Sequence, residues 1–519
     1  MSRSNYDTLP LLRSLATVGG NTLLSRVLGF LRDLVIARLF GANAATDAFL
    51  VAFKIPNFMR RLFTEGAFSL AFVPVLSEYR ERRSPAEFKQ FVDRVAGALL
   101  AFLLPLTGLG MLAASGLAIL FAPGFVSQPQ RWALTTDMLR ITLPYLPLIA
   151  LTAFAGGILN SMRRFGIPAF TPVLLNLCMI AAAGWLAPHL ERPITALAWG
   201  VLAAGVVQLA FQAPFLGRLG LLPRPRYAPW DPGVRRIGRL MGPALLGASV
   251  IQVNLLLDTL LASFLPVGSI SWLYYSNRLL EFPQGLLGVA LGTVILPRLS
   301  TQHMSEDPGA FSQTLDRALR GALVLGLPAA VGLGVLAGPM MATLFHSATF
   351  TAQDCVLSAR SLQAYALGLP AYLAIKVLAP GYYARQDGRT PMRVALITLV
   401  ANIGLSLALM RPLAHVGLAL STSLTACLNG VLLWRGLVTQ GVYRALPGWP
   451  GLTVRMALAT AIMGGALGLG VGAATDWLVA GTWQRVSWLV LWISGGGMGY
   501  FAVLFLSGFR LGHLRPGVS

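Results

Sequence analysis

Apolar stretches of about twenty residues follow one another along almost the whole of this 519-residue chain. A stretch of that length crosses the hydrocarbon core of a bilayer as an α-helix, the form that pairs its backbone polar groups internally. The composition agrees, because 55% of the residues are hydrophobic, 11% are charged and the mean hydropathy is +0.68. Soluble domains carry about 25% charged residues. The sequence therefore predicts an all-α polytopic membrane protein.

The hydropathy pattern predicts fourteen transmembrane helices, separated by breaks at clusters of glycine, proline and asparagine. The predicted spans are 12–38, 46–76, 91–121, 134–158, 166–187, 193–216, 237–264, 271–297, 316–345, 355–384, 391–411, 414–438, 452–479 and 484–508. The first span also serves as the insertion signal, since no small-residue cleavage site follows it.

The distribution of Lys and Arg predicts the orientation in the membrane. The formal net charge is +21, but the cations gather in alternate loops, as in cytoplasmic loops of membrane proteins, rather than in one nucleic-acid-binding patch. The other loops are short and nearly uncharged apart from Arg131, Arg192 and Arg411. We therefore expect both termini in the cytoplasm and no nucleic-acid partner.

The chain contains an internal repeat with an offset of 223 residues. The matching positions are residues 72–77 with 295–300, Pro147 with Pro370, Pro168 with Pro391, and Ala196-Leu197 with Ala419-Leu420. Each repeat holds six spans, an even number, so the halves run parallel, with the substrate path between them. We predict an N-lobe over 1–220, a C-lobe over 221–445 around a central cavity, and two further helices with a tail over 446–519.

Charged residues interrupt the first two spans. A charge at the middle of a membrane helix costs about 2.5–3.5 kcal/mol on insertion scales, so several together need a water-filled cavity or a charged ligand. The excess is cationic, which indicates an anion. The charged residues are Arg26, Arg32, Asp33, Arg38, Asp47, Lys54, Arg60, Arg61 and Glu65, and the second half adds Arg278 and Glu281.

Two interpretations of these charges are open, namely structural ion pairs and an anion-binding site. Pairing is favoured for Arg38 and Asp47, which lie near a span boundary. Anion binding is favoured for Arg26, Arg32, Arg61 and Arg278, because nearby carboxylates are too few to neutralise them and a guanidinium binds phosphate or carboxylate oxygens in pairs. Glu65 and Glu281 are expected to hold neighbouring arginines in place.

A second polar set is a candidate site for a monovalent cation. Asp258 lies in span 7, and Asn402, Ser406 and Thr422 supply oxygens in spans 11 and 12. Interhelical hydrogen bonds among these side chains are an equally good interpretation. No catalytic set, P-loop or metal-ligand spacing of His or Cys is present, so we expect neither an enzyme nor an ATP-driven pump.

Four motifs resemble those of one transporter family. They are Ser25–Asp33 (SRVLGFLRD), Thr46–Phe49 (TDAF), Pro56–Phe68 (PNFMRRLFTEGAF) and Val377–Asp387 (VLAPGYYARQD). Together they resemble the MurJ (MviN) lipid II flippases of the multidrug/oligosaccharidyl-lipid/polysaccharide exporter superfamily. The resemblance extends over the full length and includes the two C-terminal spans.

The resemblance implies movement of undecaprenyl-diphosphate-linked peptidoglycan precursor, lipid II, between the leaflets of the bacterial cytoplasmic membrane by alternating access. It implies substrate-binding roles for Arg26, Arg32, Arg60, Arg61 and Arg278, and acidic partner roles for Asp33, Asp47, Glu65 and Glu281. It also places the candidate sodium site at Asp258, Asn402, Ser406 and Thr422, although Ser406 stands where sodium-binding members have a carboxylate.

The expected partners are lipid II, membrane lipids and proteins of cell-wall synthesis or division. No organic cofactor is expected, and the candidate driving forces are Na⁺ and the membrane potential. The alternatives are another undecaprenyl-linked oligosaccharide flippase, a multidrug exporter of the same superfamily, and an anion channel. A drug exporter for organic cations would need carboxylates rather than an excess of arginine.

Overall fold

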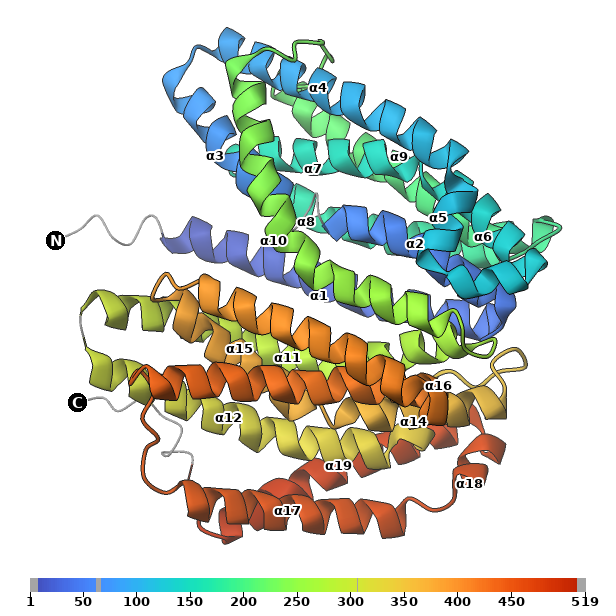
Figure 1. The fold of residues 1–519 in the computed structure, drawn as a ribbon, viewed down its shortest axis with the longest axis vertical. Coiled ribbons are helices and arrows are strands. Elements are labelled where there is room, and N and C mark those ends of the chain that lie inside the picture. The colour runs from blue at the N-terminus through green and yellow to red at the C-terminus, as the bar shows by residue number, and fades with distance from the viewer. Residues whose placement is uncertain (1–7, 62–66, 306, 511–519) are drawn as a thin grey trace. The chain divides into compact units, whose positions relative to one another are not determined.

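A computed structural model describes residues 8–61, 67–305 and 307–510, and the described residues form helices joined by short turns (Figure 1). The contacts divide the chain into two compact units, Met1–Gly268 and Ser269–Ser519. The predicted all-α class is confirmed. Glu65 lies outside the described residues, together with the rest of 62–66.

The described residues of the first unit form ten α-helices, which pack around a core of large apolar side chains. Phe72, Phe91, Phe154 and Ile158 lie at its centre and are almost completely buried. The helices are α1 (Thr8–Phe40), α2 (Ala44–Arg60), α3 (Ala67–Arg82), α4 (Pro85–Leu112), α5 (Ala114–Phe121), α6 (Pro129–Thr142), α7 (Tyr145–Ser161), α8 (Gly166–Ala181), α9 (Thr195–Arg218) and α10 (Pro232–Ala262).

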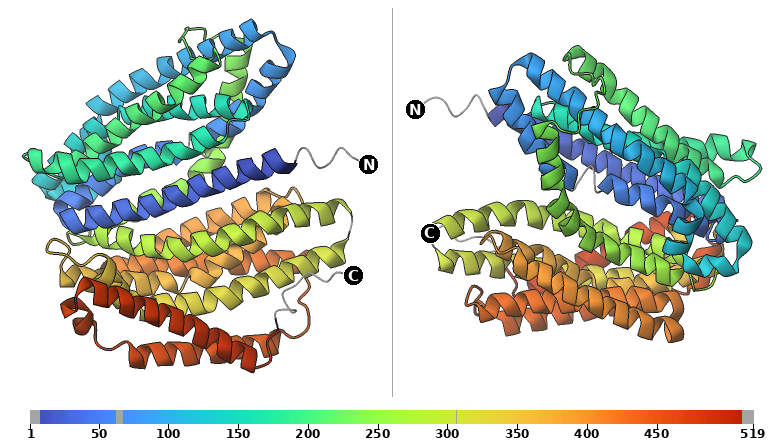
Figure 2. Two further views of the ribbon diagram at one scale, coloured as in Figure 1. Left: turned by 180° about the vertical axis from the view of Figure 1, so that it is seen from behind. Right: turned by 45° about the horizontal axis from the view of Figure 1, so that its top comes forward.

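The second unit holds the remaining nine α-helices. They are α11 (Ser269–Met304), α12 (Pro308–Val335), α13 (Ala337–Leu344), α14 (Ala352–Ala366), α15 (Leu369–Tyr383), α16 (Arg389–Thr439), α17 (Trp449–Gly470), α18 (Ala474–Val479) and α19 (Thr482–Leu506). α17 and α19 lie side by side and pack on α12 through a separate apolar core that includes Met456, Leu467 and Leu504 (Figures 1 and 2).

The described helices coincide with the predicted apolar stretches, but several stretches are divided. The stretch 46–76 corresponds to α2 and α3, and the stretch 355–384 to α14 and α15, which meet at a bend of 40°. Among the described residues, eight helices are long and apolar enough to cross a membrane, or up to nine if the bent pair is one span. The count of fourteen therefore stays a prediction.

The predicted break at Arg411-Pro412 falls inside α16, which is two helices joined at Ala414. Ala414 has φ 48° and ψ −130°, in a region that an L-residue other than glycine rarely occupies. Gly417 lies three residues further along, and a Cβ there would overlap the backbone of Leu409. The sharp turn at Ala414 therefore depends on a residue without a side chain at position 417.

The helix boundaries are consistent with the duplication. α4 and α12 have the same length, and both their ends differ by the 223-residue offset, as do the ends of α5 and α13. α10, which follows the predicted lobe boundary at 220/221, packs against α3, α4 and α5 and belongs to the first compact unit. The 220/221 boundary stays a prediction about the repeat.

A single arginine fixes the start of the last helix. Arg485 donates to the carbonyl oxygens of Leu478 and Ala480, to Ala342 O of α13, and to Nδ1 of His346 at 3.2 Å. Burial, followed by the charge of Arg485, lowers the pKa of His346, so its ring stays neutral near pH 7 and can accept that bond. α19 is thereby attached to the loop between α13 and α14.

Candidate functional site

The first helix carries one exposed and one buried arginine. Arg26 is exposed and, within the part of the chain that the structure describes, has no ion-pair partner. Arg32 is only 5% exposed, and its Nη2 lies 2.6 Å from Oδ1 of Asp33. The two arginines therefore differ in their availability to a ligand.

Arg32 also connects α1 to α8. Its Nη1 donates to Oδ1 of Asn176 at 3.1 Å, and the amide of Asn176 donates to Ser25 O at 3.0 Å. The guanidinium lies 5.9 Å from the centre of the Phe53 ring on α2. These are the contacts of a buried structural ion pair, so the structure favours the structural interpretation for Arg32 and Asp33 over direct anion binding.

Asp47 is fully buried at the start of α2. One carboxylate oxygen forms an ion pair with Nη2 of Arg131 on α6 and accepts the backbone N–H of Gly268 at 2.8 Å. The Arg131 guanidinium lies 3.7 Å from the centre of the Phe125 ring. Asp47 is therefore part of a buried ion pair, and its partner Arg131 lies 84 residues away along the chain.

The second helix ends in a group of cations. Lys54, Arg60 and Arg61 are all partly exposed, and Arg60 donates to Oδ1 of Asn57 at 3.1 and 3.3 Å. Arg60 lies in the last turn of α2 and Arg61 is its C-cap, a position where cations interact favourably with the helix dipole. The C-terminal end of α2 therefore presents two guanidinium groups that are not sealed from solvent.

In the second unit, Arg278 lies at the middle of a polar cluster on α11. Its Nη1 is 2.7 Å from a carboxylate oxygen of Glu281, and its Nη2 donates to the Tyr274 hydroxyl at 3.0 Å. Asn277 donates to the other oxygen of Glu281 at 3.0 Å. Glu281 therefore forms an ion pair with its neighbouring arginine, and Arg278 keeps a quarter of its side chain exposed.

Three residues of the candidate cation set, Asn402, Ser406 and Thr422, belong to α16 of the second unit. Asn402 donates to the hydroxyls of Ser421 and Thr425 at 3.0 and 3.2 Å, and Ser406 lies 2.6 Å from the Ser421 hydroxyl. The Thr422 hydroxyl instead donates to Leu418 O of its own helix. The hydrogen bonds of Asn402 and Ser406 with Ser421 and Thr425 join the two halves of α16, whereas the bond of Thr422 stays within one half.

Asp258, the fourth residue of the candidate cation set, belongs to the first unit. Its Oδ1 is buried and has no hydrogen-bond partner among the described residues. Lys54 is close enough for its charge to act on the Asp258 carboxylate. Among the described residues, the chain also lacks any cluster of three or more His, Cys, Asp or Glu residues suited to a metal ion.

Comparison with known proteins relates these cationic helices to one family. The sequence profile described as "Lipid II flippase MurJ" matches residues 36–487. Probable lipid II flippases MurJ from Vibrio cholerae and Haemophilus influenzae are 46% and 45% identical, over 97% and 95% of this chain and 98% and 99% of their own lengths. The chain belongs to the lipid II flippase MurJ family. The predicted family is confirmed. The prediction that the protein is a transporter and not an enzyme is confirmed with it.

The fold of this MurJ-family chain agrees with that assignment. A solved structure described as lipid II flippase MurJ in an inward closed conformation has a TM-score of 0.80 and 26% identity, covering 94% of this chain and 98% of its own. An inward-facing multidrug resistance MATE family transporter of the MOP superfamily has a TM-score of 0.67 at 14% identity, over 80% of this chain and 95% of its own. The second match shows the shared fold alone.

Two buried aspartates of the MurJ-family chain were not predicted. Asp93 of α4 accepts the backbone N–H of Arg224 at 2.7 Å, and its own carbonyl accepts Arg226 N at 3.0 Å. A Cβ at Gly97 would overlap the Arg226 backbone, so the 219–231 loop lies directly against α4. Asp93 thus attaches the loop that leads from α9 to α10.

Asp316 of α12 does the same for the loop that leads from α16 to α17. Its Oδ1 accepts the Tyr443 hydroxyl and the Trp449 indole N–H, both at 2.7 Å, and Oδ2 lies 2.7 Å from Arg320. Burial, followed by the hydrogen bond and charge of Asp316, raises the pKa of Tyr443, so the phenol keeps the proton that it donates.

Asp93 and Asp316 are separated by the 223-residue offset of the repeat. Each holds the loop that leaves its own repeat, through contacts made within one compact unit. A search of the repeat for matching acidic positions, rather than for proline and hydrophobic motifs, would have found the pair.

Proposed function

We propose that this protein translocates lipid II, the undecaprenyl-diphosphate-linked peptidoglycan precursor, from the inner to the outer leaflet of the bacterial cytoplasmic membrane. The supporting observation is a set of accessible arginines on predicted membrane helices of a MurJ-family chain, Arg26, Arg60 and Arg61 in the first unit and Arg278 in the second. Both termini are assigned to the cytoplasm.

The chemistry of the substrate fits these side chains. A diphosphate and the carboxylates of a stem peptide are anionic, and guanidinium groups bind such oxygens in pairs while remaining charged when partly desolvated. The polyprenyl tail is apolar and stays in lipid throughout. We assign binding of the head group to four arginines, namely Arg26, Arg60, Arg61 and Arg278. We assign to four acidic residues the role of holding neighbouring arginines or helices in place, namely Asp33, Asp47, Glu65 and Glu281.

The proposed mechanism is alternating access. The head group enters a cationic cavity open to the cytoplasm, the two lobes rearrange, and the head group leaves on the outer side. An inside-negative potential favours the outward movement of an anion by about 2.3 kcal/mol per elementary charge for each 100 mV. The same potential favours the return of an empty cationic cavity towards the cytoplasm.

We assign the driving force to this potential rather than to Na⁺. The hydrogen bonds of Asn402 and Ser406 with Ser421 and Thr425 support that choice, because these polar groups already have partners within the second unit.

Purified protein in vesicles that contain labelled lipid II tests both the transport and the driving force. We expect transport only in vesicles that contain the protein, and an outward rate that changes by up to about 50-fold per net charge when 100 mV is imposed or removed. Exchange of Na⁺ for K⁺ at fixed potential is the control and is expected to leave the rate unchanged. Sodium-dependent transport that ignores the potential would contradict the assignment.

A further inference from the structure

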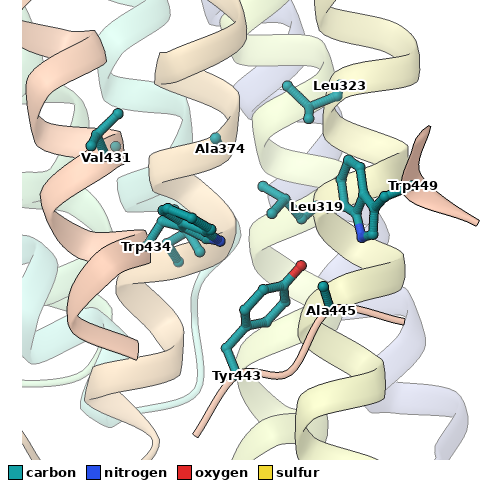
Figure 3. Close-up of a pocket in the computed structure, with 10 residues that line it drawn as sticks. Leu319, Leu323, Ala374, Val431, Trp434, Tyr443, Ala445 and Trp449 are labelled. Atoms are coloured by element: carbon teal, nitrogen blue, oxygen red, sulfur yellow. The ribbon is translucent and has the colours of Figure 1, made fainter. Parts of the chain in front are cut away.

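The second unit contains an apolar cavity of about 350 Å³ that the transport site does not use (Figure 3). α12, α15 and α16 form most of its wall, through residues such as Leu319, Leu378 and Val431. Trp434 and Trp449 lie on opposite sides of the cavity in the close-up, and Tyr443 lies below them. The volume is within the range of ordinary small-ligand pockets, which begins near 300 Å³.

Two of the three polar groups on the aromatic wall, those of Tyr443 and Trp449, already have a hydrogen-bond partner. The Tyr443 hydroxyl and the Trp449 indole N–H both donate to Asp316, and Arg320 lies 5.2 Å from the centre of the Trp449 ring. The cavity is therefore lined mainly by ring faces and aliphatic side chains. An apolar ligand suits this lining, whereas a polar solute would lose its hydrogen bonds with water and gain few in return.

The cavity opens towards the surface that faces lipid. Val431 and Trp434 are 54% and 43% exposed, and they belong to α16, one of the helices apolar enough to span a membrane. Trp434 also lies five residues from the end of α16, close to the arginine-rich loops. In a bilayer, the molecules available at that position are lipids, whose acyl chains match the lining.

The charges at the rim indicate the kind of lipid. Arg435 and Arg444 directly follow the lining residues Trp434 and Tyr443, and both are exposed. Arg444 is held in place by its backbone, which exchanges hydrogen bonds with the Ser312 hydroxyl at 2.8 and 3.1 Å. By the positive-inside rule this end faces the cytoplasm, whose leaflet is rich in anionic lipid.

We propose that this cavity binds one acyl chain of an anionic phospholipid of the inner leaflet, with its phosphate held by Arg435 and Arg444. This site is separate from the proposed lipid II site, because its lining residues are not among those assigned to head-group binding. Asp316 holds the 440–448 loop, and in this proposal it thereby also shapes the lipid site.

Photolabelling tests the proposal with the full-length protein in phosphatidylethanolamine vesicles. The probe is phosphatidylglycerol with a diazirine in one acyl chain, and labelled positions are mapped by mass spectrometry. We expect labels on the segment 429–449 and a clear excess over a phosphatidylcholine probe. Loss of each arginine is expected to weaken that preference roughly fivefold, in R435Q, R444Q and the double variant.

A glycine variant provides the steric test. A Cβ at Gly430 would have its nearest neighbour, Ile375, at 3.9 Å, so G430L fits the backbone and places its side chain in the cavity. The matched control is G404L in the first half of α16, before the turn at Ala414, where a Cβ meets nothing within 4 Å. G430L is expected to lose the label and G404L to keep it.

Three results would overturn the proposal. They are equal labelling of wild type and G430L, equal labelling by the anionic and zwitterionic probes, and removal of the label by an equal mole fraction of undecaprenyl phosphate. The first would mean unspecific contact with bulk lipid, the second would remove the role of the arginines, and the third would assign the cavity to a polyprenyl chain.

Discussion

Replacement of Arg278 by alanine is expected to abolish the ability of the protein to support growth in cells that lack any other lipid II flippase. Arg278 is partly exposed, and Glu281 and Tyr274 hold its guanidinium in a fixed position on α11. Hydrogen bonds to charged groups contribute about 1.5–3 kcal/mol, so loss of this contact with a diphosphate should slow transport roughly tenfold to hundredfold.

The matched control is Arg298→Ala, which removes an exposed arginine twenty residues further along α11. Growth complementation, the amount of inserted protein and the outer-leaflet level of lipid II are measured for both variants. Arg278→Lys is expected to recover only part of the activity, because an ammonium group lacks the paired donors of the guanidinium. Normal transport by Arg278→Ala would show that Arg278 has a structural role and does not bind the head group.

Replacement of Asp316 by alanine is expected to produce the largest loss of stability in the second unit. The carboxylate is fully buried, and its removal leaves Arg320 without its ion-pair partner and Tyr443 and Trp449 without their hydrogen-bond acceptor. Removing one partner of a buried ion pair costs about 3–5 kcal/mol. For a domain of 150–250 residues, each kcal/mol lowers Tm by about 2–4 °C.

Thermal unfolding in one detergent measures this effect, with Asp307→Ala as the control on the same helix. Asp307 is an exposed N-cap that accepts the N–H of Ala310, so its loss should cost only about 1 kcal/mol. Asp93→Ala is expected to fall between the two, because its cationic partner Lys89 is one-quarter exposed and can regain water. A Tm for Asp316→Ala equal to that of Asp307→Ala would show that this carboxylate is not an anchor.

The helical regions of this chain are predictable because apolar length is a local property of the sequence. The division of single stretches is less predictable. Proline at position 412 indicated a break, whereas the turn lies at Ala414, where the small Gly417 admits the backbone of Leu409. The position of the turn is determined by the close approach of two chain segments, and a hydropathy pattern contains no information about such a contact.

The candidate site was predictable as a set of residue types but not as a set of contacts. The excess of arginine over carboxylate indicated an anion, yet Arg26 and Arg32 looked alike in sequence. Asn176 distinguishes them, since it binds Arg32 from a position 144 residues away. Asp47 likewise finds Arg131 only in the folded chain. Pairings at such separations require the tertiary structure.

The most direct test of lipid II transport is the distribution of lipid II between the two leaflets after depletion of this protein. The test uses a host with no redundant flippase and a membrane-impermeant enzyme that cleaves the exposed head group. We expect lipid II to accumulate in protected form during depletion, and restored expression to return it to the outer leaflet. Unchanged cleavage of lipid II in depleted cells would mean that this protein is not the lipid II flippase.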